Sequence, residues 1–193
     1  MDISLLRQVP LFEGLDDEQL EAIAPVTITR HFDKDQVIIL AEEEGDALFI
    51  ISQGQVKVSI VSEDGREVIL SLLGTGAVFG ELSLLDGKPR SANVVATQNT
   101  ELYMLRRSDF LQLVYKVPQI AVGLLSELAS RLRKTDRKIE GLALLDVTSR
   151  ISETLLQLAE EQGGATQKGV LLKSRPTNQQ IANMSGTTRE TVS

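Results

Sequence analysis

The sequence predicts an α+β protein in which a small all-β barrel or sandwich is followed by helices. From residue 27 to residue 105, short β-branched runs alternate with turn signals, at the spacing of many short strands. A seven-residue apolar repeat then marks a long helix over residues 118–145. Two short segments near the end of the sequence open with helix-capping patterns. We therefore expect three parts, which cover residues 1–117, 118–145 and 146–193.

The β-rich part is expected to contain short strands joined by tight turns. Residues 56–61 alternate apolar and polar side chains, as in a strand with one buried face. Asp64-Gly65 lies between two β-branched runs and signals a hairpin. Ahead of this part, residues 4–23 show helical periodicity, with Asp16 or Asp17 as an N-cap. Strands are expected over residues 36–40, 48–51, 56–61, 67–73 and 102–105.

The composition excludes several kinds of chemistry. The 193-residue chain contains no cysteine, which excludes disulfides, thiolate zinc sites, cysteine-ligated iron–sulfur clusters and a cysteine nucleophile. His31 is the single histidine, so neither a histidine metal site nor a Ser-His-Asp triad is expected. We predict no metal site, no catalytic cofactor and no enzymatic activity. No apolar run approaches the roughly 18 residues of a membrane span, so we expect a soluble, cytoplasmic protein without a membrane partner.

The long helix carries an a/d heptad seam. Its positions are spaced alternately by four and three residues, and six of the seven are apolar. This repeat favours a two-stranded coiled coil, and so a homodimer. The alternative is a helix that lies on the core of its own chain. The seam consists of Ala121, Leu125, Leu128, Leu132, Thr135, Ile139 and Leu142. Thr135, the polar member, either fixes the register or contacts something buried between the helices.

The C-terminal part is expected to contain a helix-turn-helix. Asp146 can cap a helix over residues 147–161, and a strand is expected over residues 169–173. Residues 177–180 and 187–190 match capping boxes that begin with Thr177 and Thr187, and Ser185-Gly186 makes the turn between their helices. Any helical hairpin could use this pattern. The whole chain has a net charge of −7, whereas residues 165–193 carry four basic and one acidic side chain. This excess indicates a polyanionic partner, and the alternative is ordinary variation over a short segment.

Residues 79–92 combine the groups that a nucleotide site needs. Their glycine-started turn can become one helical turn, whose N-terminus offers unpaired N–H groups to an anion. Arg90 can bind phosphate oxygens in bidentate fashion, and Ser91 can donate a further hydrogen bond. Glu81 does not suit a phosphate but suits ribose hydroxyls, from which it can accept hydrogen bonds. The alternative is a surface salt bridge between Glu81 and Arg90, with glycines that only turn the chain.

The same stretch closely resembles the phosphate-binding cassette of cyclic-nucleotide-binding domains, and residues 45–54 resemble the strand and turn that precede it. The order of cassette, long helix, Leu144-Leu145-Asp146-Val147-Thr148 hinge and helix-turn-helix resembles the Crp/Fnr family of regulators, over nearly all of residues 5–193. The match is closest to the cAMP-responsive branch. The resemblance implies an N-terminal jelly-roll-like β-roll (a double-stranded β-helix), a dimerisation helix and a truncated, winged-helix-like DNA-binding domain.

The resemblance also implies roles for individual residues, with cAMP as an allosteric ligand. Glu81 would hold the ribose 2′-hydroxyl, Arg90 the cyclic phosphate, and Thr135 the adenine amino group. Asp136 departs from the cAMP receptor pattern, which has serine there. An aspartate could accept from adenine or from guanine, or could simply be solvated, so cGMP or another effector remains an alternative. The implied ligand residues are Gly80, Glu81, Leu82, Ser83, Arg90, Ser91, Arg131, Thr135 and Asp136.

Double-stranded DNA and RNA polymerase are the further partners that the resemblance implies. Arg189 and Glu190 would face bases in the major groove, and Thr177, Thr187 and Thr188 would lie near phosphates. The family's recognition helix and the hairpin after it are incomplete in this sequence, so we expect a fragment that binds specific DNA poorly. The alternatives are a constitutive regulator, and a cyclic-nucleotide sensor that does not use DNA. A nucleotide hydrolase is disfavoured because no activating base or metal cluster is evident.

Overall fold

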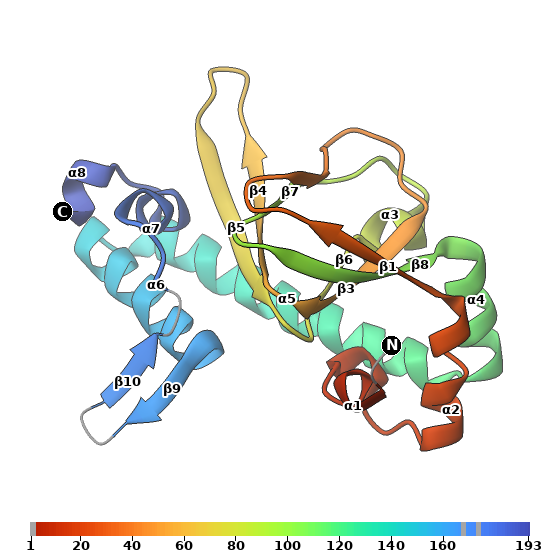
Figure 1. The fold of residues 1–193 in the computed structure, drawn as a ribbon. Helices are drawn as coiled ribbons and strands as arrows, with labels where there is room; N and C mark the ends of the chain where they lie inside the picture. Colours follow the sequence, from red (N-terminus) through yellow and green to blue (C-terminus); the bar gives the residue numbers. More distant parts are fainter. Residues whose placement is uncertain (1–2, 167–168, 173–174) are drawn as a thin grey trace. The chain divides into compact units, whose positions relative to one another are not determined.

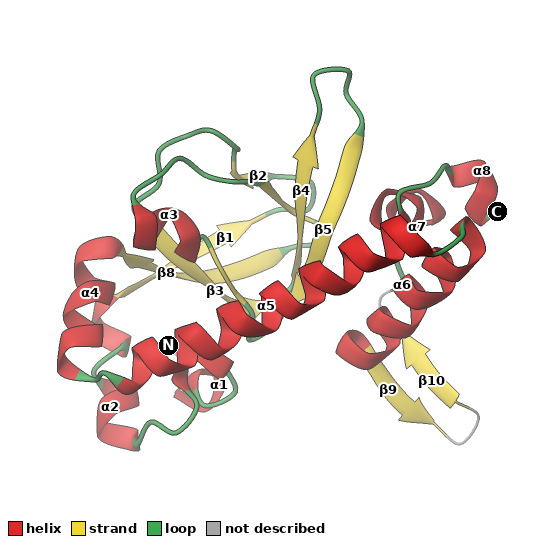
Figure 2. Cartoon of the chain, turned by 180° about the vertical axis from the view of Figure 1, so that it is seen from behind, coloured by secondary structure: helices red, strands yellow, loops and turns green. Residues whose placement is uncertain are grey.

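The computed structural model describes residues 3–166, 169–172 and 175–193. The chain divides into two compact units (Figure 1). The first consists of Met1–Ile60 and Ser71–Arg131, and the second of Val61–Leu70 and Leu132–Ser193. Helix α5 (Gln119–Leu144) supplies residues to both units and is one continuous helix (Figure 2). No helix in these described ranges has the length and apolar character needed to cross a membrane.

The first unit begins with short helical pieces. They are α1 (Ile3–Leu6), the 3-10 turn η1 (Pro10–Phe12), α2 (Asp17–Glu21) and the 3-10 turn η2 (Ala24–Val26). The helical periodicity of residues 4–23 therefore does not correspond to one helix, because Pro10 restarts the chain in η1 and Gly14 adopts a φ of +82°. Asp16 is the N-cap of α2 and forms a capping box with Gln19, which confirms one of the two expected caps.

Two antiparallel four-stranded sheets form the body of the β-rich region. The first has the order β1 (Thr27–Phe32), β8 (Thr100–Arg106), β3 (Ala47–Gln53) and β6 (Val78–Phe79). The second has the order β2 (Val37–Ile39), β7 (Asn93–Ala96), β4 (Gln55–Val61) and β5 (Glu67–Gly74). The expected strands are confirmed within a few residues. The Asp64-Gly65 hairpin is also confirmed, because the Ser62 N–H donates to the Arg66 carbonyl at 2.9 Å.

Apolar side chains from both sheets form one of the two core clusters of the first unit. The Phe49 and Phe79 rings stack there, with centroids 5.2 Å apart. The other cluster joins the N-terminal helices to α4 (Arg107–Lys116) and to the start of α5 through Ile120 and Leu124. Leu84 of α3 (Glu81–Asp86) is fully buried in the same cluster. Helix α4 was not expected from the sequence.

Gly123 lets α5 approach η1 closely, and we predict that Gly123→Ala destabilises the protein. A Cβ atom there would lie 2.4 Å from the Leu11 carbonyl oxygen. Helix propensity alone favours alanine by about 1 kcal/mol, but overpacking against the backbone should reverse the sign and cost about 1–3 kcal/mol. Gly141→Ala in the same helix is the control, because its added Cβ would meet side chains and no backbone, namely the exposed Glu153 carboxylate at 3.1 Å and Leu145 at 3.7 Å. A urea midpoint for Gly123→Ala equal to the wild type would contradict this account.

The second unit contains the end of α5, then α6 (Val147–Gln162), the hairpin β9 (Gly163–Thr166) and β10 (Gly169–Leu172), α7 (Asn178–Ser185) and α8 (Arg189–Val192). Two expected caps are confirmed, because the Asp146 side chain accepts from the Ser149 N–H and Thr177 forms a capping box with Gln180. The capping box predicted at Thr187 is wrong. Helix α8 has Thr188 as its N-cap, without a side-chain cap bond, because Gly186 ends α7 in the left-handed region and the turn uses one more residue.

The tip of the β4–β5 hairpin belongs to the second unit and contacts two of its helices. Lys138 Nζ of α5 donates to the Leu70 carbonyl at 2.5 Å, and Asn183 of α7 donates to Glu67 Oε2 at 3.0 Å. Burial lowers the pKa of Lys138, and the nearby Glu161 carboxylate acts in the opposite direction. Arg150 of α6 donates to the Ser185 carbonyl at 3.0 Å and so ties α6 to the end of α7.

Candidate nucleotide site and DNA-binding segment

The candidate nucleotide site begins at the left-handed residue Gly80, which is the N-cap of α3. Its φ of +81° suits glycine, and a Cβ atom there would lie 2.8 Å from Arg90 Nη1 and 3.0 Å from the Ala47 carbonyl oxygen. Glu81 and Ser83 are buried in the first turn, whereas Leu82 is exposed. Only glycine therefore allows Arg90 to lie against this turn.

Arg90 is buried and crosses between two backbone segments. Only 7% of it is exposed, and its guanidinium donates to the Gly80 carbonyl at 2.8 Å and to the Ala47 carbonyl at 2.9 Å. A Cβ atom on Gly45 would overlap the Arg90 side chain, 1.9 Å from Nε. Burial lowers the pKa of Arg90, and the nearby Asp46 and Glu81 carboxylates oppose this effect. Arginine still remains protonated in proteins, so the site keeps a positive charge.

Glu81 is a buried carboxylate with one oxygen available. It is 3% exposed, and its Oε1 accepts from Arg131 Nη1 of α5 at 2.8 Å. Its Oε2 is buried and has no hydrogen-bond partner within the described part of the chain. Arg131 also donates to Glu127 at 2.9 Å and to the Val78 carbonyl. The alternative of a surface salt bridge between Glu81 and Arg90 is wrong, because both side chains are buried and Glu81 pairs with Arg131.

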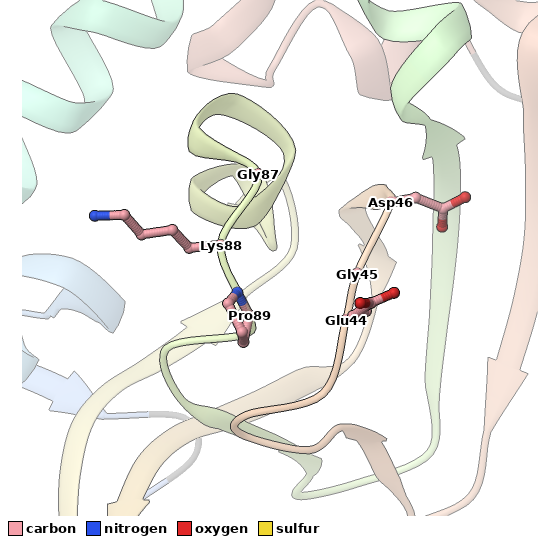
Figure 3. A pocket seen from close by; sticks show the side chains of 6 residues that line it. All are labelled: Glu44, Gly45, Asp46, Gly87, Lys88 and Pro89. Carbon is pink, nitrogen blue, oxygen red and sulfur yellow. The ribbon is translucent and has the colours of Figure 1, made fainter.

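An open hollow of about 440 Å³ lies beside the cassette. Figure 3 shows its two walls, in which the loop before β3 faces the loop between α3 and Arg90, while Lys88 and Asp46 point away from the gap. Ser91, which follows Arg90, is exposed. The lining residues are Glu44, Gly45, Asp46, Gly87, Lys88 and Pro89. The hollow therefore borders Gly45, the residue whose missing side chain leaves room for Arg90.

The remaining expected ligand residues lie on α5. Arg131 is in the first unit, on Glu81, whereas Thr135 and Asp136 belong to the second unit and are exposed. The structure thus brings together Gly80, Glu81, Arg90 and Arg131, and it does not test the contacts that were expected of Thr135 and Asp136.

The heptad seam of α5 is largely exposed. Leu125, Leu132, Ile139 and Leu142 are each between 59% and 65% exposed, and Ala121 and Leu128 are half-buried. The core of the chain is instead contacted by the neighbouring face, where Ile120 and Leu124 are buried. The alternative that the seam lies on the core of its own chain therefore does not hold for these four residues.

The expected DNA-binding residues surround the turn between α7 and α8. Thr177 caps α7, and Thr188 caps α8 through its backbone. Arg189 and Glu190 are exposed in the first turn of α8, and Thr187 is half-buried. Hydrogen bonds from the Glu190 backbone N–H and the Thr188 hydroxyl hold the pKa of Glu190 below its ordinary value. Arg189 and Glu190 are thus available to a partner as opposite charges.

Arg107 contacts the cassette and was not singled out from the sequence. Its Nε donates to the Leu84 carbonyl of α3 at 2.7 Å, and its backbone N–H donates to the Asp46 carbonyl at 2.6 Å. The only sequence signal was a pair of arginines directly after the strand expected over residues 102–105.

Two family models match the chain. A cyclic nucleotide-binding domain matches residues 29–116, and a Crp-like helix-turn-helix domain matches residues 149–193. The first range contains the whole cassette and the second contains α7 and α8. The fold and the site thus define the class of regulators that join a nucleotide-binding domain to a DNA-binding domain.

Similar proteins agree with this class. The cyclic AMP receptor protein of Thermus thermophilus is 36% identical over 184 residues, which cover 95% of this chain and 82% of that protein. A CRP-like cAMP-activated global transcriptional regulator of Mycobacterium tuberculosis is 32% identical over 190 residues, which cover 97% and 84%. The solved catabolite activator protein of Thermus thermophilus aligns with a TM-score of 0.65 and 35% identity, over 95% of this chain and 83% of that one. The chain belongs to the Crp family of transcription regulators.

Proposed function

We propose that this chain is a cAMP-responsive, homodimeric, DNA-binding transcription regulator. The observation that carries the proposal is the buried Oε2 of Glu81, which has no hydrogen-bond partner within the described residues. An unsatisfied buried carboxylate oxygen is costly, and a ligand hydroxyl would satisfy it. The names of the similar proteins from Thermus and Mycobacterium support cAMP as that ligand.

The cassette supplies complementary groups for the two ends of a cyclic nucleotide. Glu81 would accept a hydrogen bond from the ribose 2′-hydroxyl. Arg90 uses its bonds to the Gly80 and Ala47 carbonyls to hold its place, and a guanidinium has five N–H donors, so donors remain for the cyclic phosphate. Gly80, Leu82 and Ser83 would contribute through the backbone and Ser91 through its hydroxyl.

The exposed heptad seam supports the homodimer. Burial of four large apolar side chains that are now in water would favour pairing of two α5 helices. Thr135 and Asp136 would then contact the base of the nucleotide near the dimer axis. We retain residues 1–117, 118–145 and 146–193 as the proposed nucleotide-binding, dimerisation and DNA-binding parts.

The regulator would act on double-stranded DNA in the cytoplasm, with RNA polymerase as a further partner and without enzymatic activity. Two copies of α8 would read half-sites about one helical turn apart, with Arg189 and Glu190 on base edges and Thr177, Thr187 and Thr188 near phosphates. For cAMP to regulate binding, it must bind the DNA-competent state better than the other state.

A different effector is the second candidate. A c-di-GMP responsive global regulator of Xanthomonas campestris has a solved structure that aligns with a TM-score of 0.79 and 26% identity, over 92% of this chain and 88% of that one. Structural likeness therefore extends to a regulator with another effector. Asp136 favours testing guanine ligands, because a carboxylate can accept from the guanine N1–H and amino group.

The test is isothermal titration with cAMP and with cGMP, followed by a gel shift of the intact protein on promoter DNA. We expect micromolar cAMP binding and a DNA shift that increases with cAMP. Tighter cGMP binding would favour the second candidate, and Asp136→Ser should then restore the preference for cAMP. No heat and no change of melting temperature with either nucleotide would overturn the proposed ligand. No shift with any promoter DNA would overturn the regulator.

A further inference from the structure

Helix α3 is too short to be stable without contacts to the rest of the protein. It has six residues, fewer than an isolated helix needs to be stable in water. The last four carbonyls of a helix have no partner inside it. In α3 the Ser83 carbonyl accepts from the Gly87 N–H at 3.0 Å. The Leu84 carbonyl is the next one along the helix that needs a donor. Leu84 is fully buried, so its carbonyl needs a partner from elsewhere in the protein.

Arg107 provides that partner from the start of α4. Its Nε donates to the Leu84 carbonyl at 2.7 Å, a short distance for a bond with a charged donor. A cation at the C-terminal end of a helix also interacts favourably with the helix dipole. At the other end of α3, Arg90 donates to the Gly80 carbonyl. An arginine therefore holds each end of the helix that presents Glu81.

The two arginines also hold adjacent residues at the start of β3. Arg90 donates to the Ala47 carbonyl at 2.9 Å, and the Arg107 backbone N–H donates to the Asp46 carbonyl at 2.6 Å. Arg107 thus fixes α3 to the same segment that Arg90 bridges. Arg107 is exposed and does not belong to the buried apolar cluster, so a change there removes this bond without opening the apolar core.

We propose that Arg107 is a positioning residue of the nucleotide site, which holds α3 so that Glu81 and Arg90 have their binding geometry before the ligand arrives. The expected effect of Arg107 on ligand affinity rests on the proposed function. The expected effect of Arg107 on α3 is independent of the proposed function, because the contact to Leu84 is present without a ligand.

The experiment compares Arg107→Met, Arg107→Lys and Arg106→Met. Methionine keeps much of the apolar stem and removes the donor, and lysine keeps a charged donor. Arg106→Met is the matched control, since the neighbouring arginine is exposed and its side chain makes no hydrogen bond or ion pair with the described residues. The readouts are amide hydrogen exchange of residues 80–87 in the ligand-free protein, cAMP affinity by titration, and melting temperature.

We expect Arg107→Met to speed exchange in residues 80–87 and to weaken cAMP binding about tenfold, the loss expected for one charge-assisted hydrogen bond. Lysine should restore affinity to within about threefold of the wild type, and the control should change neither readout. A general loss of stability would instead speed exchange throughout the first unit and would not be rescued by lysine. If Arg107→Met does not fold, Arg107→Gln takes its place.

The outcomes separate this inference from the proposed function. Unchanged exchange in residues 80–87 of Arg107→Met would overturn the positioning role, whatever the ligand. Faster exchange with unchanged cAMP affinity would overturn its importance for the site. If the wild type binds neither cAMP nor cGMP, the proposed ligand fails, and exchange in the ligand-free protein still decides whether Arg107 holds α3.

Discussion

Arg90→Ala should lower the affinity for cAMP by a factor of about 100 or more, because two charge-assisted hydrogen bonds to the phosphate are lost at once. It also leaves the Gly80 and Ala47 carbonyls without their donor, so the turn before α3 loses its support. The measurement is isothermal titration at a temperature well below the melting temperature of the variant. The change should therefore remove both a ligand contact and the geometry of Glu81.

Lys88→Ala is the control for Arg90→Ala. It removes one positive charge two residues away, from an exposed side chain that points away from the hollow (Figure 3). We expect its cAMP affinity to stay within about threefold of the wild type, since exposed charges interact weakly. If Arg90→Ala bound cAMP as well as Lys88→Ala does, Arg90 could not be the phosphate-binding residue.

The double change Leu132→Glu with Ile139→Glu should convert the proposed dimer to a monomer at micromolar concentration. Each apolar side chain contributes about 1.5–3 kcal/mol when it is fully buried, and the change removes two from each α5 helix of a pair. Introduced carboxylates would also repel each other across the seam. Sedimentation velocity measures the outcome directly, and cAMP-dependent DNA binding should be lost with the dimer because one subunit reads one half-site.

Arg137→Glu is the control for the seam variant. Its side chain is exposed. Arg137 is two residues from each of the seam positions Thr135 and Ile139, which places it on the opposite side of the helix from the seam. Replacing an arginine with a glutamate changes the charge of the helix more than replacing a leucine or an isoleucine with a glutamate does. Arg137→Glu should nevertheless leave the proposed dimer intact. A double variant that still sediments as a dimer would show that α5 pairing through this seam is not what joins the subunits.

Local patterns in the sequence correctly predicted much of the fold. Alternation with period two identified β4, and turn chemistry identified the hairpin after it. Capping residues identified the starts of α2, α6 and α7, because a cap is satisfied by residues two or three positions away. The second capping box failed because the left-handed Gly186 ends α7 and the turn after it uses one more residue, so that Thr188 rather than Thr187 precedes α8.

The sequence by itself determined which chemical groups the candidate site contains, because the cassette is contiguous and its residue types are informative. Only the tertiary structure decided how these groups are used. Glu81 pairs with Arg131, which lies fifty residues later in the sequence. Arg90 donates to the carbonyl of Ala47, which lies forty-three residues earlier. The close approach at Gly123 and the bond from Arg107 to Leu84 are also long-range. Such contacts depend on which segments the folded core brings together, and no local period or spacing encodes them.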